Sequence, residues 1–166
     1  MKRIRSKLRS VIILDDNIPH PSFPDFLARP GRCTDADFQI APKIHHTRLA
    51  IHCLRIMRSQ LRQNMLELDA TERYTPNKEI QDLQSRIDAS ISTDLVYAIS
   101  YWGVHVLGAD LSEELLTPLG EFVSSLLLVW VEVLSLLGRL EGAYTSLEQA
   151  ISATVCSCHQ LRVCNI

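Results

Sequence analysis

The feature that most constrains this sequence is an almost unbroken apolar stretch, EFVSSLLLVWVEVLSLL, from Glu121 to Leu137. A helix that is apolar on every side is normally buried by other helices. We therefore predict that this stretch is the central helix of a bundle, and that Gly138 ends it. Its longest uncharged part, Phe122 to Val131, has ten residues. A membrane-spanning helix needs about 20, so the sequence predicts no membrane span.

Apolar residues recur at helical spacing in the segments on either side of this stretch. The pattern predicts a long helix from His45 to Leu68, a shorter one that ends at Ile91 with Asn77 as its candidate cap, and a third that begins at Ser92 or Thr93. Ser112 is a further candidate cap. A line of large residues outlines the last predicted helix, namely Leu140, Tyr144, Leu147, Ile151 and Val155.

The N-terminal residues have a different pattern. In LRSVIILDDNIPHPSF, two short runs of strand-forming character flank the turn residues Asp15, Asp16 and Asn17. The predicted fold is therefore mainly α, a helical bundle with a small N-terminal β-hairpin. The expected organisation is a hairpin segment at residues 1–30, a loop at 31–44, a helical domain at 45–155 and a tail of unassigned structure at 156–166.

Charge is divided unevenly along the chain. Residues 1–62 carry 12 Lys and Arg against five Asp and Glu, whereas residues 87–138 carry seven acids and no Lys or Arg. Either these are two solvated faces, or they dock electrostatically, on each other or on a partner. The net charge of −2 gives no reason to expect nucleic-acid binding.

Motifs for catalysis are absent from the sequence. It contains no Gly-rich phosphate loop, no Gly-x-Ser-x-Gly elbow and no His-Glu-x-x-His. His46 and Cys53 share a helix face, but a helix-start histidine and a core cysteine explain them more simply than a catalytic pair. His105, beside an aromatic group, is interpreted as a packed or partly exposed residue. We predict that the chain is not an enzyme.

Five cysteines, an odd number at irregular spacing, indicate reduced thiols and a cytoplasmic protein, since no signal peptide precedes them. The C-terminal cluster CSCHQLRVC offers Cys156, Cys158, His159 and Cys164 as metal ligands. A zinc site usually has two such groups, so no metal is predicted. A metal- or thiol-dependent enzyme that uses this tail stays as a third hypothesis.

One stretch, HPSFPDFL, begins at His20 between two prolines. It resembles the His-x-Ser-Phe-x-(Asp/Glu)-Phe segment that closes the winged helix of NACHT-type signalling NTPases, the STAND class that includes NOD-like receptors. Three more stretches resemble the helical region of large fungal NACHT proteins, and the resemblance runs from about Leu8 to Ala153. They are HHTRLAIHCLRIMRSQLRQNM, DLQSRIDASISTDLVYAISYWGVHV and VWVEVLSLLG.

The resemblance implies a role for His20. In the family this histidine reaches the phosphates of bound ADP and helps to hold the inactive state, so residues 1–30 would be part of a winged helix. ADP or ATP is the cofactor of the full-length family. This chain lacks the nucleotide-binding domain, and we expect no cofactor in it.

The leading hypothesis is thus a truncated NACHT-type protein, a regulatory or interaction helical module without NTPase activity of its own. A protein partner is expected. The alternative is a stand-alone helical scaffold that binds a protein partner through its acidic central surface.

Overall fold

The computed structural model describes residues 32, 41–69, 71–72 and 75–163, with side chains as far as residue 155. The chain divides into two units at Pro42–Lys43, and nearly all described residues belong to the second unit. This part of the chain contains six α-helices, one short 3-10 helix and no strand. The prediction of a mainly α protein is confirmed. The predicted hairpin lies outside the described residues.

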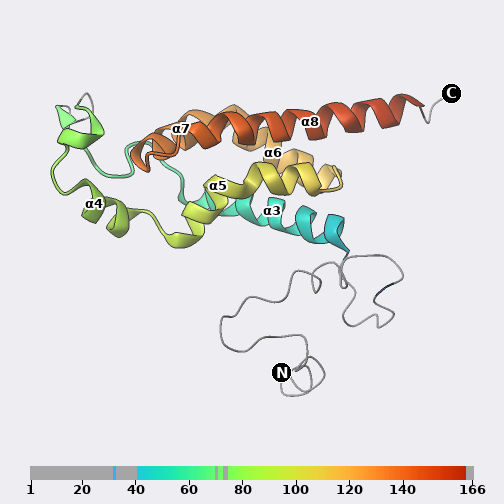
Figure 1. The fold of residues 1–166 in the computed structure, drawn as a ribbon, viewed down its shortest axis with the longest axis horizontal. Coiled ribbons are helices and arrows are strands. Elements are labelled where there is room, and N and C mark those ends of the chain that lie inside the picture. Colours follow the sequence, from blue (N-terminus) through green and yellow to red (C-terminus); the bar gives the residue numbers. More distant parts are fainter. Residues whose placement is uncertain (1–31, 33–40, 70, 73–74, 164–166) are drawn as a thin grey trace, which may run out of the picture. The chain divides into compact units, whose positions relative to one another are not determined.

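Three long helices form the body of the second unit (Figure 1). Helix α3 runs antiparallel to α5, and α8 lies along α5 in the same direction (Figure 1). The short helix α4 lies beyond one end of these helices. The elements in chain order are α3 (Pro42–Gln60), η2 (Asn77–Glu79), α4 (Leu83–Ser90), α5 (Thr93–Gly108), α6 (Glu113–Ser125), α7 (Leu127–Leu136) and α8 (Glu141–Val163).

Two predicted boundaries are wrong at the ends of the helical region. Helix α3 begins at Pro42, inside the predicted loop 31–44. Proline fits the first turn of a helix because its missing N–H has no partner there in any case. Helix α8 continues to Val163, so most of the tail at 156–166 is helical and the helical region extends past residue 155.

Two predicted helix signals are confirmed. Ser92 is the N-cap of α5, and its Oγ accepts a hydrogen bond of 3.1 Å from the Leu95 N–H. Gly138, with φ +65°, follows α7. The Arg139 N–H donates to the Leu134 carbonyl and the Gly138 N–H to the Ser135 carbonyl, which is the Schellman arrangement that a left-handed glycine allows.

Helix α3 ends eight residues before the predicted Leu68, because Asn64 competes for backbone groups. Its Oδ1 accepts from the Leu68 N–H at 2.8 Å, and its Nδ2 donates to the Leu68 carbonyl at 3.0 Å. Asn64 and Glu67 both have positive φ. The resulting turn buries Met65 and Leu66 as well as Leu68, which a single helix face could not do.

The predicted central helix is not continuous. The chain bends by 71° between α6 and α7, at Leu126. The Ser124 hydroxyl donates to the Glu121 carbonyl at 3.1 Å, a bond of the kind that bends helices. Eight residues rise about 12 Å along a straight helix, whereas the rings of Phe122 and Trp130 lie 5.9 Å apart.

The bend therefore lets both rings reach Trp102 of α5. Its ring centroid lies 4.9 Å from that of Phe122 and 5.6 Å from that of Trp130, both edge-on. All three side chains are fully buried. Trp130 Nε1 donates to the Ile99 carbonyl at 2.9 Å. The core is thus centred on α5 rather than on the apolar stretch.

The bend also bears on the membrane prediction. Among the residues that the structure describes, no single helix has the length and hydropathy of a membrane span. Helices α6 and α7 have this length and hydropathy only when they are taken together, and the chain bends by 71° between them.

Candidate functional site

Helix α8 meets α5 through small residues. A Cβ added to Gly103 of α5 would lie 2.6 Å from the Ser146 carbonyl oxygen and 2.7 Å from the Ser146 Cα. The two backbones approach so closely that only glycine fits there. Ser146 and Ala150 are buried, and Ala143 and Ala153 are partly buried beside them.

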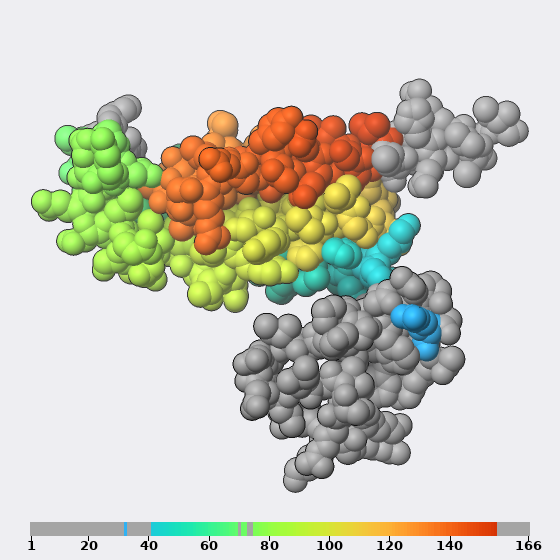
Figure 2. Space-filling view, in the orientation of Figure 1, coloured from blue at the N-terminus to red at the C-terminus, as the bar shows by residue number. Residues whose placement is uncertain are grey.

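This contact leaves the large apolar residues of α8 outside. Leu140 is 47% exposed, Tyr144 70%, Ile151 60% and Val155 52%, while Leu147 is partly buried. We call these five residues the α8 stripe. The predicted helix is present, but the residues that outline it do not form its buried side, because the close approach at Gly103 turns the small side of α8 inward. In the space-filling view, no other described helix covers the side of α8 that faces the viewer (Figure 2).

Helix α5 also exposes apolar residues on the side away from the core. Tyr97, Tyr101 and Val104 are 43%, 50% and 40% exposed, and the two tyrosine rings lie 5.0 Å apart. Their spacing of four and three residues places them on one side of the helix. We call these three residues the α5 face. Such exposed apolar groups are typical of protein interaction sites.

A polar chain joins α3 to α5 beside the α5 face. The Nδ1 atoms of His46 and His105 lie 3.1 Å apart, and the Tyr97 hydroxyl lies 2.8 Å from His105 Nε2. His105 is buried, which confirms that it is a packed residue. Burial, followed by the neighbouring His46, lowers the pKa of His105. The hydrogen bond needs a proton on one of the two Nδ1 atoms and a lone pair on the other, so it is lost when both atoms carry a proton.

Sequence reasoning missed this pairing, because His46 was considered with Cys53 instead. Cys53 is buried, and desolvation raises the pKa of its thiol to about 11. A thiol that stays protonated is a poor nucleophile, which agrees with a core cysteine. The missed signal was Gly108: the His46 ring occupies the space over it, within 2.7 Å of where a Cβ would lie.

The basic and acidic parts of the chain meet within the second unit. The carboxylates of Asp110, Glu114 and Glu121 form ion pairs with residues of α3. These are Lys43–Asp110 at 3.3 Å, Arg55–Glu114 at 3.9 Å and Arg58–Glu121 at 2.6 Å. Three ion pairs therefore join α3 to the acidic part of the chain. All three pairs are largely exposed, so each adds little stability.

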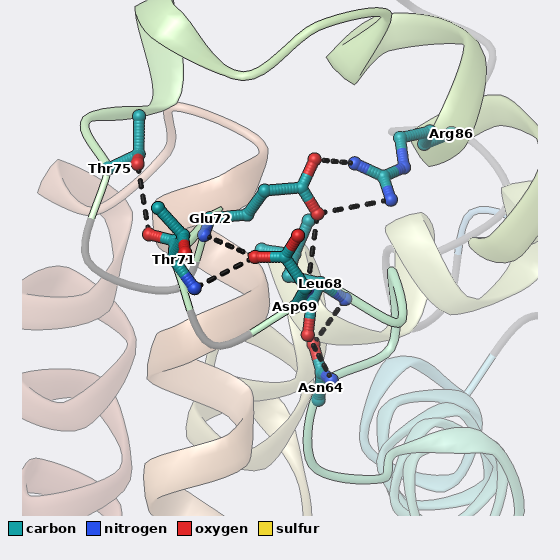
Figure 3. Close-up of polar contacts among 7 residues, drawn as sticks. All are labelled: Asn64, Leu68, Asp69, Thr71, Glu72, Thr75 and Arg86. Atoms are coloured by element: carbon teal, nitrogen blue, oxygen red, sulfur yellow. Dashed lines mark hydrogen bonds and ion pairs between the residues drawn. The ribbon is translucent and has the colours of Figure 1, made fainter.

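The polar segment between α3 and α4 borders a groove of about 470 Å³. Side chains of this segment form hydrogen bonds with its own backbone and with Arg86 of α4 (Figure 3). Arg86 donates to both oxygens of Glu72, at 2.8 and 3.3 Å, and Asp69 accepts from the N–H groups of Thr71 and Glu72. Asn77, predicted as a helix cap, instead donates to the Ser135 carbonyl at 2.7 Å. These bonds hold an irregular segment in place, so we assign the groove a structural role.

The predicted ligand residues lie elsewhere. His20 falls outside the described residues, and so do the side chains of Cys156, Cys158, His159 and Cys164. Among the side chains that are described, no three of the His, Cys, Asp and Glu groups come together as metal ligands would.

Known proteins do not extend this description. No protein-family model, no curated protein and no solved structure matches this chain. The described residues offer two exposed apolar surfaces, namely the α8 stripe and the α5 face. Both suit association with another protein.

Proposed function

We propose that this chain is a helical interaction module of the NACHT type, with no NTPase activity of its own, which acts in the cytoplasm by binding a protein partner. The observation that carries the proposal is the exposed apolar surface of the α5 face and the α8 stripe. The α5 face is 40% to 50% exposed, and Leu140 together with three residues of α8 is 47% to 70% exposed, although the same bundle has a closely packed aromatic core. Exposed apolar surface of this kind favours a binding role.

The proposal names the NACHT family because four segments of the sequence resemble NACHT proteins. The described helices carry three of these segments, since α3, α4 to α5, and α7 contain them. In the proposed arrangement, His20 would meet the phosphates of ADP only when a separate nucleotide-binding domain supplies the rest of the site. The chain alone would bind neither ADP nor ATP tightly.

The acidic central surface is the weaker candidate for the partner site. Three of the seven acids, Asp110, Glu114 and Glu121, already form ion pairs with α3. Less unpaired negative charge is then left to attract a basic partner. Among the described residues, the apolar surfaces have no comparable partner.

The test is to mix the purified chain with an ADP-loaded nucleotide-binding domain of a NACHT protein and to measure the complex by size-exclusion chromatography with light scattering. We expect a complex that His20→Ala weakens at least about tenfold, or about 1.4 kcal/mol. Tyr101→Glu on the α5 face should weaken it too, whereas His52→Ala, an exposed control on α3, should not. Absence of a complex, or steady phosphate release by the chain alone, would contradict the proposal.

A further inference from the structure

The spacing of the α8 stripe is that of a helix-pairing seam. From Leu140 to Leu147 to Val155 the stripe residues follow one another at steps of four, three, four and four. Alternating steps of three and four keep one side of a helix facing a partner helix; the steps as far as Ile151 alternate in this way, and Val155 lies one residue past the next position of the series. The contact with α5 uses the small residues around Ser146 instead, so the seam has no partner among the described elements.

The stripe is also close to a palindrome. When two copies of α8 lie antiparallel and Leu140 faces Val155 of the other copy, Tyr144 faces Ile151 and the two Leu147 side chains meet near the centre. A two-fold dimer requires one patch that is complementary to itself. The α8 stripe meets this requirement without a residue from any other element.

Charge favours the antiparallel direction over the parallel one. Both acids of α8, Glu141 and Glu148, lie in its first eight residues, and the sequence after Glu148 has no acid but includes Arg162. In the antiparallel register Glu141 of one copy lies beside the acid-free residues around Thr154 of the other, and only the two Glu148 residues stay near each other, at the centre. Parallel helices would place the two acidic halves side by side, where like charges repel.

We propose that the α8 stripe is a dimer interface, in which the α8 helices of two copies of this chain pair antiparallel, with Tyr144 against Ile151 of the second copy. The proposal rests on the proposed function, since it names a second copy as one occupant of the interaction surface. A single helix face is at the small end of specific interfaces. The dimer is therefore reversible and depends on protein concentration.

Sedimentation equilibrium of the purified chain tests the proposal, because the dissociation constant is read from the concentration dependence of the mass. We expect the wild-type chain to pass from monomer to dimer as its concentration rises. Tyr144→Glu and Ile151→Lys should each raise the dissociation constant at least about tenfold. Both side chains are exposed in the single chain, so helix content by circular dichroism should not change. Val155→Glu gives the same test if either variant folds poorly.

The double variant Tyr144→Glu/Ile151→Lys determines the direction of the pair. Antiparallel helices bring each new Glu against a new Lys of the other copy, so dimerisation should recover relative to both single variants. Parallel helices would bring Glu against Glu and Lys against Lys, and dimerisation would stay lost. The control is Thr145→Glu/Ser152→Lys, with the same charges at exposed positions outside the stripe, which should dimerise like the wild type.

Three results would overturn the proposal. They are a wild-type chain that stays monomeric at the highest concentration reached, a dimer that neither single variant weakens, and a double variant that does not recover. These measurements use the chain alone. A monomeric chain that still binds the nucleotide-binding domain would refute only the dimer, whereas a dimer that does not bind this domain would refute only the NACHT-type function.

Discussion

Helices α5 and α8 lie side by side, but they bury opposite kinds of residue. Helix α5 turns large side chains into the core, including Ile99, Trp102 and Val106, each fully buried. Helix α8 turns Ser146 and Ala150 inward and leaves Tyr144 and Ile151 in solvent. The difference shows that the closeness of a helix contact decides which side of an amphipathic helix is buried.

The cause of this difference lies in α5 rather than in α8. Gly103 removes the side chain that would keep the α8 backbone at a distance, and the Ser146 backbone occupies that space. Many dispersion contacts between two close backbones can replace the burial of a few large side chains. The large side chains of α8 then become available for binding.

A matched pair of isoleucines tests this comparison with the largest effect. Ile99→Ala removes a fully buried side chain and should lower the free energy of unfolding by about 2–5 kcal/mol. Ile151→Ala removes one that is 60% exposed, and should change it by no more than about 0.5 kcal/mol. Urea denaturation at low protein concentration measures both. Equal losses would mean that α8 buries its stripe after all.

A matched pair of glycines tests the close approach itself. Gly103→Ala would place a Cβ 2.6 Å from the Ser146 carbonyl oxygen and should destabilise the protein by about 1–3 kcal/mol. Gly120→Ala in α6 meets nothing within 4 Å. It should stabilise the protein by about 0.5–1 kcal/mol, because alanine is the better helix former. If thermal denaturation gives the two variants the same sign, α5 and α8 do not pack as described.

The N-cap of α5 provides an intermediate effect. Ser92→Ala removes the bond from the Leu95 N–H to the Ser92 Oγ and should lower stability by about 1 kcal/mol. Ser112→Ala at the start of α6 is the control, since the Ser112 side chain forms no capping bond. A loss at Ser112 as large as that at Ser92 would contradict the assigned caps. Chemical denaturation of the two variants supplies the comparison.

The smallest effect concerns pH and the contact of α5 with α3. Because the pKa of His105 is lowered in the folded chain, the unfolded chain takes up this proton first as the pH falls below about 6.5. The free energy of unfolding therefore falls as the pH drops from this value towards the lower pKa that His105 has in the folded chain. The groups that face His105 are His46 and Tyr97. Denaturation midpoints at about pH 7.5 and 5.5 measure the slope.

His105→Gln should reduce this slope, and the exposed control His52→Gln should leave it unchanged. A slope that His105→Gln does not alter would assign the pH dependence to other groups.

The helices themselves were largely predictable from the sequence. The cap at Ser92, the stop at Gly138 and the buried side of α5 follow from local chemistry and period. The end of α3 was not predictable in the same way, because Asn64 favours a turn only together with Leu68 and with Glu132, whose carboxylate accepts from the Asn64 N–H. The bend at Leu126 likewise depends on the ring of Trp102.

The interaction surface was the least predictable part. The sequence contains the α8 stripe, but its spacing fits a core face as well as a docking face. The close contact between Gly103 and Ser146 is what distinguishes a docking face from a core face here, and these residues lie 43 positions apart in the chain. The NACHT resemblance and the role of His20 stay predictions from sequence.

Hydroxyl-radical footprinting of Tyr144, followed by mass spectrometry across a range of protein concentrations, tests the exposed stripe most directly. We predict that Tyr144 reacts as readily as Tyr101 in the dilute chain and becomes protected as the concentration rises, while Trp102 stays protected throughout. Protection of Tyr144 equal to that of Trp102 in the dilute chain would mean that α8 faces the core with its large residues, and would contradict the account.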